Sequence, residues 1–426
     1  MSELDVAIIG AGVIGLSIAF HLVEKGARIV VIDRNPEGDK ASFGNAGAIA
    51  VTEVVPAAAP RAIWRAPGWM LDPLGPLSIR PKYTLSLIPW LFAFAKASTP
   101  ERMESASRAL ASINGRAYDD LLPMLAELGL GNELHRTGAL TLYESERGYR
   151  ADAAEWKAKQ LCGVVTKDLT ASEARELEPA LGRRVYRAVM TPQWSYVSDP
   201  KALVDRLREW AVAQGVRIIR GEVEQVGKDV GSTSVVKLVG KRHVQSRCVV
   251  IAAGAWSGEL AKTVGDRVLL ESERGYNTTL TDPGVTVRHQ LIFAERKFVA
   301  TPLSCGLRIG GAAEFGGLRA APNFRRSRVL TELAAAFLPG LRTEQGVMWA
   351  GHRPTTPDSL PVIGASPRNP NVYYAFGHGH LGLTQAATTG RVVSELLTGL
   401  PPSVNLRPFS VSRFAVLRDA QIPISD

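Results

Sequence analysis

The N-terminal stretch contains the pattern that most restricts what this chain can fold into. Residues 6–9 form a short apolar run that predicts a buried parallel strand, and the sequence then enters the GxGxxG turn of residues 10–15. A helix with an apolar face follows from about Val13 to Lys25, and a second apolar run ends at Asp33. A strand, a glycine turn, a helix, a strand and an acid in this order predict a Rossmann-like unit that binds a dinucleotide.

The residues of this turn have separate expected roles. Gly10 permits the tight turn, Gly12 lets a pyrophosphate approach the backbone, and Gly15 lets the helix pack closely on the sheet. The helix begins at Val13 and Ile14, where unpaired N–H groups and the positive end of the helix dipole favour a phosphate. We therefore expect a pyrophosphate to lie against this turn.

The acid at the end of the second apolar run bears on which dinucleotide the site accepts. The Asp33 carboxylate can accept hydrogen bonds from both hydroxyls of an adenosine ribose and would repel a 2′-phosphate. Arg34 weakens this exclusion, because its guanidinium could bind such a phosphate. The fingerprint alone does not distinguish NAD from FAD.

Further segments rich in small residues are expected to lie against the same ligand. Residues 36–50 have the composition of a loop that contacts a ligand, although an ordinary connecting loop has the same composition. Residues 248–257 begin as a buried strand and end in small residues, and the backbone near residue 223 could lie beside an adenine. The expected contacts in these segments are Ser42, Asn45, Ala46, Gly47, Val223, Ala253, Gly254 and Trp256.

The composition limits the class of protein. A chain of 426 residues that is 46% hydrophobic can bury the cores of two or three domains. The formal charge is +9, but the sequence contains no run of five basic residues, which argues against nucleic acid as a partner. The charge is then explained by a solvated surface or by a mild attraction for anionic substrates or lipids. Cys162, Cys248 and Cys305 are too scattered for a disulfide framework or a C-x-x-C site, which favours a reducing compartment. With neither a secretory signal pattern nor a spanning apolar run, we expect a cytoplasmic protein.

Residues 84–95 form the most hydrophobic segment of the chain, within a proline-rich stretch that covers residues 52–100. Packing in a core or between domains would explain this segment. The sharper alternative is shallow docking at the inner face of the cytoplasmic membrane, and the lack of a basic face on the segment counts against it.

The hydrophobic pattern of the rest of the chain predicts alternating helices and strands. Helices are expected at residues 100–130, 149–161, 167–181, 199–213 and 384–397. Strands are expected at residues 137–143, 186–190, 194–197, 216–219, 248–251 and 307–315, and a hairpin at residues 233–240 and 242–248.

Five motifs together resemble one family. They are the N-terminal fingerprint, SFGNAGAIA at residues 42–50, VVIAAGAWS at 249–257, WAGHRPTTPDSLPVIG at 349–364 and FGHGHLGLTQAATTG at 376–390. Over essentially its whole length the chain is similar to the FAD-dependent amine oxidoreductases of the D-amino-acid oxidase superfamily. Within it the chain most resembles the bacterial D-amino-acid dehydrogenases, with D-hydroxyproline dehydrogenases nearby.

The resemblance implies an α/β fold, α+β overall, in which a Rossmann-like FAD-binding domain is interleaved with an antiparallel-sheet substrate domain. The implied FAD-binding domain is discontinuous and comprises residues 1–50, 150–225, 245–265 and 345–426. The substrate domain and its connections then comprise residues 51–149, 226–244 and 266–344. The C-terminal motifs contain no cysteine for the thioether-linked flavin of sarcosine-oxidase relatives, so FAD is expected to bind noncovalently.

The glycine-rich loop at residues 377–384 is expected to press against the flavin, because a flat ring needs backbone close to it. The helix that follows would point its N-terminus at the pyrimidine end of the reduced flavin. The expected contacts are Gly377, Gly379, Leu381, Gly382 and Thr384. His378 and His380 could instead form a metal pair, but no matching carboxylate or cysteine ligands accompany them, and no metal is expected.

On the substrate side, the resemblance puts Arg353 where amino-acid-oxidising relatives grip the substrate carboxylate with a planar guanidinium. A structural salt bridge is the alternative role for this arginine. Tyr276 could donate its hydroxyl to the same carboxylate, and Arg274 is a weaker candidate that could equally hold neighbouring acids. His352, His380 or Tyr276 could assist deprotonation of the amine.

These features predict oxidative deamination of a D-amino acid, or of a cyclic D-imino acid such as D-proline or hydroxyproline. Hydride would pass from Cα to flavin N5, and no side chain is assigned as general acid or base. Oxygen, a quinone or a partner redox protein could accept the electrons. The alternatives are a glycine- or sarcosine-oxidase-like enzyme that uses oxygen, a NAD-linked dehydrogenase, and a flavoprotein subunit of a larger complex.

Overall fold

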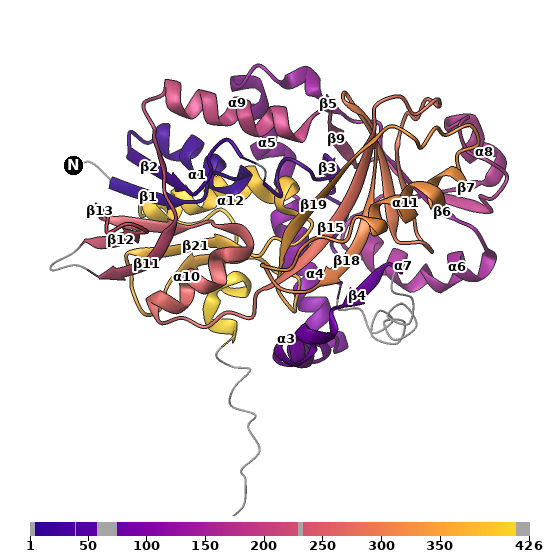
Figure 1. Cartoon of the computed structure of the whole chain (residues 1–426). Helices are drawn as coiled ribbons and strands as arrows, with labels where there is room; N and C mark the ends of the chain where they lie inside the picture. The colour runs from indigo at the N-terminus through magenta and orange to yellow at the C-terminus, as the bar shows by residue number, and fades with distance from the viewer. Residues whose placement is uncertain (1–4, 39, 58–74, 229–232, 415–426) are drawn as a thin grey trace, which may run out of the picture.

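The computed structural model describes residues 5–38, 40–57, 75–228 and 233–414. In this part of the chain two large sheets lie side by side, with helices around them (Figure 1). Residues 58–74, which belong to the proline-rich stretch noted above, lie outside the described residues.

The first sheet has six strands in the order β10-β2-β1-β14-β21-β20. The first five of these run parallel to one another, and β20 is antiparallel at the edge. The strands are β1 (Asp5–Ile9), β2 (Arg28–Asp33), β10 (Arg217–Arg220), β14 (Cys248–Ile251), β20 (Val362–Ala365) and β21 (Val372–Phe376). The N-terminal strand therefore lies inside a sheet whose strands, except for its neighbour β2, come from distant parts of the chain.

Both faces of this sheet are buried, which explains the continuous apolar runs of its strands. On β1, Val6 and Ile8 join the core formed with helices above the sheet, whereas Ala7 and Ile9 pack into a second core on the opposite face. The first face is covered by α1 (Val13–Val23), α9 (Pro200–Ala213) and α12 (Gly382–Leu397). The opposite face is covered by α10 (Ser257–Val264) and by the strands β11 (Val223–Lys228), β12 (Ser234–Leu238) and β13 (His243–Ser246).

The second sheet is mainly antiparallel and follows the path β19-β15-β18-β17-β16-β6-β8-β7, with β4 paired to β18. Only the β16–β6 and β18–β4 pairs are parallel in it. The strands are β4 (Leu77–Ile79), β6 (Ala139–Tyr143), β7 (Lys167–Thr170), β8 (Arg187–Thr191), β15 (Glu271–Leu280), β16 (Gln290–Phe293), β17 (Phe298–Leu303), β18 (Gly306–Phe315) and β19 (Gly346–Thr355). Helix α11 (Arg325–Ala335) packs on β15 and β18. A parallel sheet beside a mainly antiparallel one confirms the predicted fold class.

The other elements connect the two sheets or lie at their edges. A small sheet contains β3 (Ala48–Ile49), β9 (Ser195–Val197) and β5 (Leu134–His135). The remaining helices are α3 (Thr84–Ala97), α4 (Pro100–Asn114), α5 (Ala117–Glu127), α6 (Glu146–Ala151), α7 (Ala153–Leu161) and α8 (Ala171–Leu177). The helices predicted at residues 100–130 and 149–161 are therefore each divided in two.

The predicted helix at residues 167–181 is wrong in its first part. Residues 167–170 form strand β7 instead, and the helix begins only at Ala171. Thr170 caps it: the Thr170 hydroxyl accepts from the Glu173 N–H at 3.3 Å, and the Glu173 carboxylate accepts from the Thr170 N–H at 2.8 Å. This reciprocal capping box fixes the helix start and leaves the preceding residues free to pair with β8.

Sheet membership departs from the predicted domain division in three places. Strands β7 and β8, within residues 150–225, belong to the mainly antiparallel sheet, and so does β19, within residues 345–426. Strand β12, within residues 226–244, and strand β13, which begins there and ends at Ser246, cover the parallel sheet instead. The chain thus crosses between the two sheets more often than its motifs indicate, because the motifs mark ligand contacts and not sheet edges.

Helix α3, the most hydrophobic predicted segment, has two unlike faces. Leu87 and Trp90 are buried and pack near Phe315 of β18. Leu85 and Phe92 are 80% and 61% exposed, and the helix lies at the periphery of the molecule (Figure 1). The face with Leu87 and Trp90 therefore packs in a core, and the face with Leu85 and Phe92 is exposed to solvent. Among the described residues, no helix combines the length and the apolar character needed to cross a bilayer.

Helices α1 and α12 pack at unusually close range. A Cβ added at Gly390 in α12 would lie 2.5 Å from the carbonyl oxygen of Ser17 in α1. A glycine at this position therefore lets the two backbones touch. Among the described residues, this contact joins the first α-helix to the last one.

We expect Gly390→Ala to destabilise the protein by about 1–2 kcal/mol, because overpacking outweighs the gain in helix propensity. Gly258→Ala in α10 is the matched control, since its Cβ would meet Leu270 at an ordinary 3.5 Å. The measurement is the urea midpoint of the cofactor-loaded proteins. A Gly390→Ala midpoint at or above that of Gly258→Ala would contradict the close-packing argument.

Candidate active site

A cavity of about 1560 Å³ lies between the two sheets. Its walls include the carboxyl ends of β1, β2 and β14, the loops that follow them, and strands β15, β18 and β19. The cavity exceeds the usual size of about 300–1,000 Å³ for a pocket that holds one small ligand. It therefore offers room for a dinucleotide together with a small substrate.

The glycine turn forms one end of this cavity. Gly10 has a φ of +114°, and a Cβ there would lie 2.3 Å from the carbonyl oxygen of Ala252. A Cβ on Gly15 would lie 2.0 Å from the carbonyl oxygen of Gly10, so this glycine serves packing and does not line the cavity. At Gly12 the nearest atom to an added Cβ is the Ser42 Oγ at 3.4 Å. The backbone at Gly12 is thus open to a ligand, as a pyrophosphate requires.

The acid predicted to bind ribose lines the cavity beside this turn. The Asp33 carboxylate accepts from the Ala11 N–H and the Asn35 N–H, both at 2.8 Å, and from the Lys40 ammonium at 3.2 Å. A carboxylate offers about four acceptor sites, so hydroxyl donors can still bind to it. The Arg34 guanidinium lies 3.8 Å above the Trp256 ring, and both residues line the same end.

Most of the predicted cofactor contacts line this one cavity. The residues in its wall are Gly10, Gly12, Val13, Ile14, Asp33, Arg34, Ser42, Asn45, Ala46, Val223, Ala253, Gly254, Trp256, Gly379 and Gly382. Segments from both ends and the middle of the sequence therefore meet here. The residues fit a dinucleotide, because the open glycine backbone, the helix N-terminus at Gly12 and the Asp33 carboxylate lie together.

Five predicted contacts lie behind the wall. Besides Gly15, Gly47 takes a φ of +70° and packs against the carbonyl oxygen of Val197. The Thr384 hydroxyl accepts from the Ala50 N–H at 2.9 Å and so ties α12 to the loop of residues 42–50. The other two are Gly377, with a φ of +83°, and Leu381, which is buried at the start of α12. These residues shape the wall without reaching the cavity.

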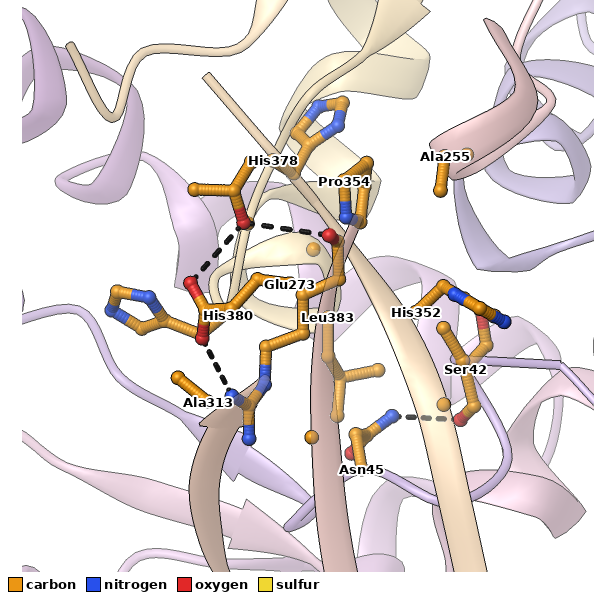
Figure 2. A pocket seen from close by; sticks show the side chains of 18 of the residues that line it. Ser42, Asn45, Ala255, Glu273, Ala313, His352, Pro354, His378, His380 and Leu383 are labelled. Atoms are coloured by element: carbon orange, nitrogen blue, oxygen red, sulfur yellow. Dashed lines mark hydrogen bonds and ion pairs between the residues drawn. The ribbon is translucent and has the colours of Figure 1, made fainter. Parts of the chain in front are cut away.

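Arg353 lines the cavity from the second sheet, on strand β19. Its Nη1 donates to the Glu273 Oε1 at 2.7 Å and to the Ala312 carbonyl oxygen at 3.1 Å. A Cβ on Gly275 would lie 2.4 Å from the Arg353 Nη2, so glycine at 275 makes room for the guanidinium. Figure 2 shows Glu273 and His380 grouped in this part of the cavity.

The other substrate candidates are placed differently. Tyr276 borders the cavity but is only 1% exposed, and its hydroxyl accepts from the Asn323 N–H at 3.0 Å. Arg274 does not line the cavity. It is buried, and its Nη1 lies 3.6 Å from the Glu314 carboxylate. Arg274 therefore fits the alternative role of holding a neighbouring acid.

Three histidines line the cavity, and their environment keeps each imidazole neutral near pH 7. Burial lowers the pKa of His378 to about 3, and its Nε2 lies 3.1 Å from the Thr389 hydroxyl. Burial, followed by the positive charges of Arg274 and Arg34, lowers the pKa of His352 to about 4. Burial also lowers the pKa of His380. Within the described residues no three His, Cys, Asp or Glu side chains are grouped as a metal site would require.

The sequence motifs gave no role to several side chains that build the wall. The Asn277 amide donates to the Gly44 carbonyl oxygen at 2.5 Å, and Arg308 donates to the Asn45 carbonyl oxygen at 2.7 Å. Trp349 packs so closely that a Cβ on Gly44 would lie 2.2 Å from its ring. These contacts fix the loop of residues 42–50 against the second sheet. The one sequence signal for this role was that Trp349 belongs to the same motif as Arg353.

A buried ion pair also lines the cavity. The Lys159 ammonium lies 2.8 Å from the Glu53 carboxylate and 3.3 Å from Glu155. Burial alone would raise the pKa of Glu53, but the charge and hydrogen bond of Lys159 outweigh it and lower that pKa. Glu53 therefore stays ionised and engaged by its own partner.

Comparisons with known proteins agree with this architecture. Residues 5–396 match the family model described as FAD dependent oxidoreductase, DAO. The chain is 35% identical over 417 residues to a D-amino-acid oxidase of Bradyrhizobium diazoefficiens, covering 96% of this chain and 98% of that protein. It is 28% identical to a D-amino acid dehydrogenase of Rhizobium rhizogenes, covering 96% and 100%.

Solved structures share the fold. Glycine oxidase from Geobacillus kaustophilus superposes with a TM-score of 0.73 at 23% identity, covering 97% of this chain and 99% of that one. L-proline dehydrogenase from P. horikoshii superposes with a TM-score of 0.74 at 20% identity, covering 97% and 98%. The predicted resemblance is confirmed: this chain is an enzyme of the DAO family of FAD-dependent oxidoreductases.

Proposed function

We propose that this enzyme oxidises the Cα of a D-amino acid or a cyclic D-imino acid, such as D-proline or hydroxyproline, with noncovalently bound FAD. The observation that carries the proposal is one cavity whose two sides differ chemically. The glycine turn and Asp33 line it from the first sheet, and Arg353 lines it from the second sheet. The curated relatives named D-amino-acid oxidase and D-amino acid dehydrogenase support the choice of substrate.

The FAD would be held by the turn at Gly12 and Val13, by Asp33 at the ribose, and by the backbone of Gly379 and Gly382 near the ring. None of the three cysteines is in the cavity wall, which supports noncovalent binding. The cofactor supplies the acceptor for the Cα hydrogen and its electron pair, so that the amine becomes an imine and water then yields a 2-oxo acid.

The protein's own contribution is to bind and orient the substrate. Arg353 binds the carboxylate with its planar guanidinium and thereby fixes the direction of the Cα–H bond. The neutral imidazoles of His352 and His380 can donate or accept a hydrogen bond without adding charge. No side chain has to act as general base, provided the amine binds in its neutral form.

The acceptor that reoxidises the flavin is a second part of the proposal. Oxygen, a quinone or a partner redox protein are the candidates, because relatives carry both oxidase and dehydrogenase names. A glycine- or sarcosine-oxidase-like enzyme would release peroxide. A subunit of a larger complex would turn over only after its partners are added.

We expect the purified protein to be yellow and to bleach anaerobically with a D-amino acid or D-proline. Acid precipitation should release the flavin into the supernatant, because no covalent bond holds it. Absorbance is recorded across a panel of D- and L-amino acids, and oxygen is then admitted while peroxide is assayed. A flavin spectrum unchanged by the whole panel contradicts the proposed function.

Arg353→Ala should raise KM for the amino acid about 10- to 150-fold with FAD still bound, since a hydrogen bond to a charged group contributes about 1.5–3 kcal/mol. Steady-state kinetics and the flavin-to-protein ratio measure this. Arg342→Ala, which breaks an exposed ion pair with Asp282, is the control. An unaltered KM in Arg353→Ala removes this arginine from carboxylate binding.

We also propose that the exposed face of α3 rests on an anionic membrane surface. Leu85, Ile88, Leu91 and Phe92 are exposed on this helix. Residues 81–100 contain Lys82 and Lys96 and no acid, and the whole chain carries a formal charge of +9. Leu91 also lines the cavity, so docking would bring the cavity close to lipid-dissolved quinone. A cytoplasmic protein with such a contact remains our prediction.

Leu85→Ser with Phe92→Ser should weaken binding to vesicles that contain phosphatidylglycerol by at least about tenfold, because two large apolar side chains lose their burial in lipid. Co-sedimentation measures the bound fraction. Leu161→Ser is the matched control, since Leu161 is 81% exposed on another helix. An equal loss in the control, or no binding by the unmodified protein, overturns the membrane contact.

A further inference from the structure

The carboxylate that faces Arg353 was given no role by the sequence motifs. Glu273 on β15 and Arg353 on β19 are directly opposed in the antiparallel ladder, and their charged groups meet at 2.7 Å. Both side chains line the cavity, with 21% and 29% of their surface exposed. The Glu273 carboxylate and the Arg353 guanidinium therefore lie side by side in the cavity wall. Glu273 is labelled in Figure 2.

The arginine keeps donors available in spite of this ion pair. Both of its hydrogen bonds, to Glu273 and to the Ala312 carbonyl oxygen, leave from Nη1. Among the described residues its Nε and Nη2 have no hydrogen-bond partner. Nη2 lies over Gly275, which is itself part of the cavity wall. A carboxylate can therefore bind to the Nε–Nη2 edge while Glu273 stays in place.

Glu273 likewise keeps acceptor capacity. Its Oε1 accepts from Arg353, and its Oε2 lies 3.4 Å from the Thr355 hydroxyl. A carboxylate offers about four acceptor sites, so further N–H donors can bind to it. Glu53, the other carboxylate whose charge acts on His380, already has the Lys159 ammonium at 2.8 Å. Glu273 is thus the better placed of the two to accept from a ligand.

An α-amino acid carries its own two groups in the same arrangement. Its carboxylate and its amino group are bonded to one carbon, so a ligand held by Arg353 presents its N–H donors next to that arginine. A carboxylate accepts hydrogen bonds from a neutral amine as well as from an ammonium ion.

We infer that Glu273 binds the α-amino group of the substrate and is the residue that selects amino and imino acids over carboxylates without nitrogen. The inference rests on the proposed function and deepens it by assigning the second recognition group. Arg353 alone would accept any small carboxylate. The pair accepts one that also brings N–H donors within reach of Glu273.

The test compares the amino acid that reduces the wild-type flavin fastest with its deamino analogue, for example D-alanine with propionate. The FAD-loaded wild type is compared with Glu273→Gln, which keeps the size of the side chain but loses its charge, and with Glu273→Asp, which keeps the charge. Amino-acid affinity comes from the concentration dependence of anaerobic flavin reduction. Analogue affinity comes from titration of the oxidised flavin spectrum.

Glu273→Gln should lower the affinity for the amino acid at least about tenfold. The analogue should bind as well as before or more tightly, because Arg353 no longer has a carboxylate of the protein as its partner. Glu273→Asp should recover part of the amino-acid affinity. Asp282→Asn is the control, because Asp282 forms an exposed ion pair with Arg342. It should leave the affinity for both ligands unchanged.

Three other results overturn the inference. The first is an equal loss of affinity for both ligands in Glu273→Gln, which would indicate that Glu273 only positions Arg353. The second is an unchanged affinity for the amino acid in Glu273→Gln. The third is loss of flavin from both Glu273 variants. Failure of the proposed function is distinct from all of these. In that case no amino acid reduces the wild-type flavin, whatever the variants do.

Discussion

The site depends first on the backbone contact between α1 and α12. Gly390 has no side chain, so α12 lies against the carbonyl oxygen of Ser17 in α1. Both helices begin at the cavity, where Gly12 and Gly382 are in the wall. The positive ends of two helix dipoles are thereby directed at one ligand site, which favours the negative charge of a pyrophosphate and of a reduced flavin.

The second sheet contributes a different kind of precision. Strands hold their side chains at fixed spacing, and the β15–β19 ladder sets Glu273 opposite Arg353. Gly275 on β15 leaves room for the guanidinium, and the Ala312 carbonyl oxygen accepts a hydrogen bond from it on β18. Glu273 and Arg353 are therefore held by paired strands and not by a loop, which suits the substrate-binding roles proposed for them.

Local patterns in the sequence predicted what depends on local chemistry. The glycine turn, the acid at residue 33 and the start of α12 are each fixed by a few consecutive residues. Each contributes residues to the cavity wall, and Gly15, Leu381 and Thr384 lie behind it. The role of Glu273 was missed because its partner Arg353 is 80 residues away in the sequence. Nothing in the sequence of residues 271–276 indicates the register in which β15 pairs with β19. The start of α8 was missed for a related reason, since the periodicity of residues 167–181 hid the capping box at Thr170.

The strand order also has a consequence for biosynthesis. Strand β1 emerges from the ribosome early, yet its neighbour β14 begins at residue 248 and β21 at residue 372. Until those residues are made, the edge of β1 that faces away from β2 in the nascent parallel β1–α1–β2 unit has no partner, and such long-range pairings form slowly. The fingerprint at residues 10–15 is therefore translated long before Gly379 and Gly382, so the cavity wall that contains Gly12 and these two glycines is complete only once the chain has been made as far as α12.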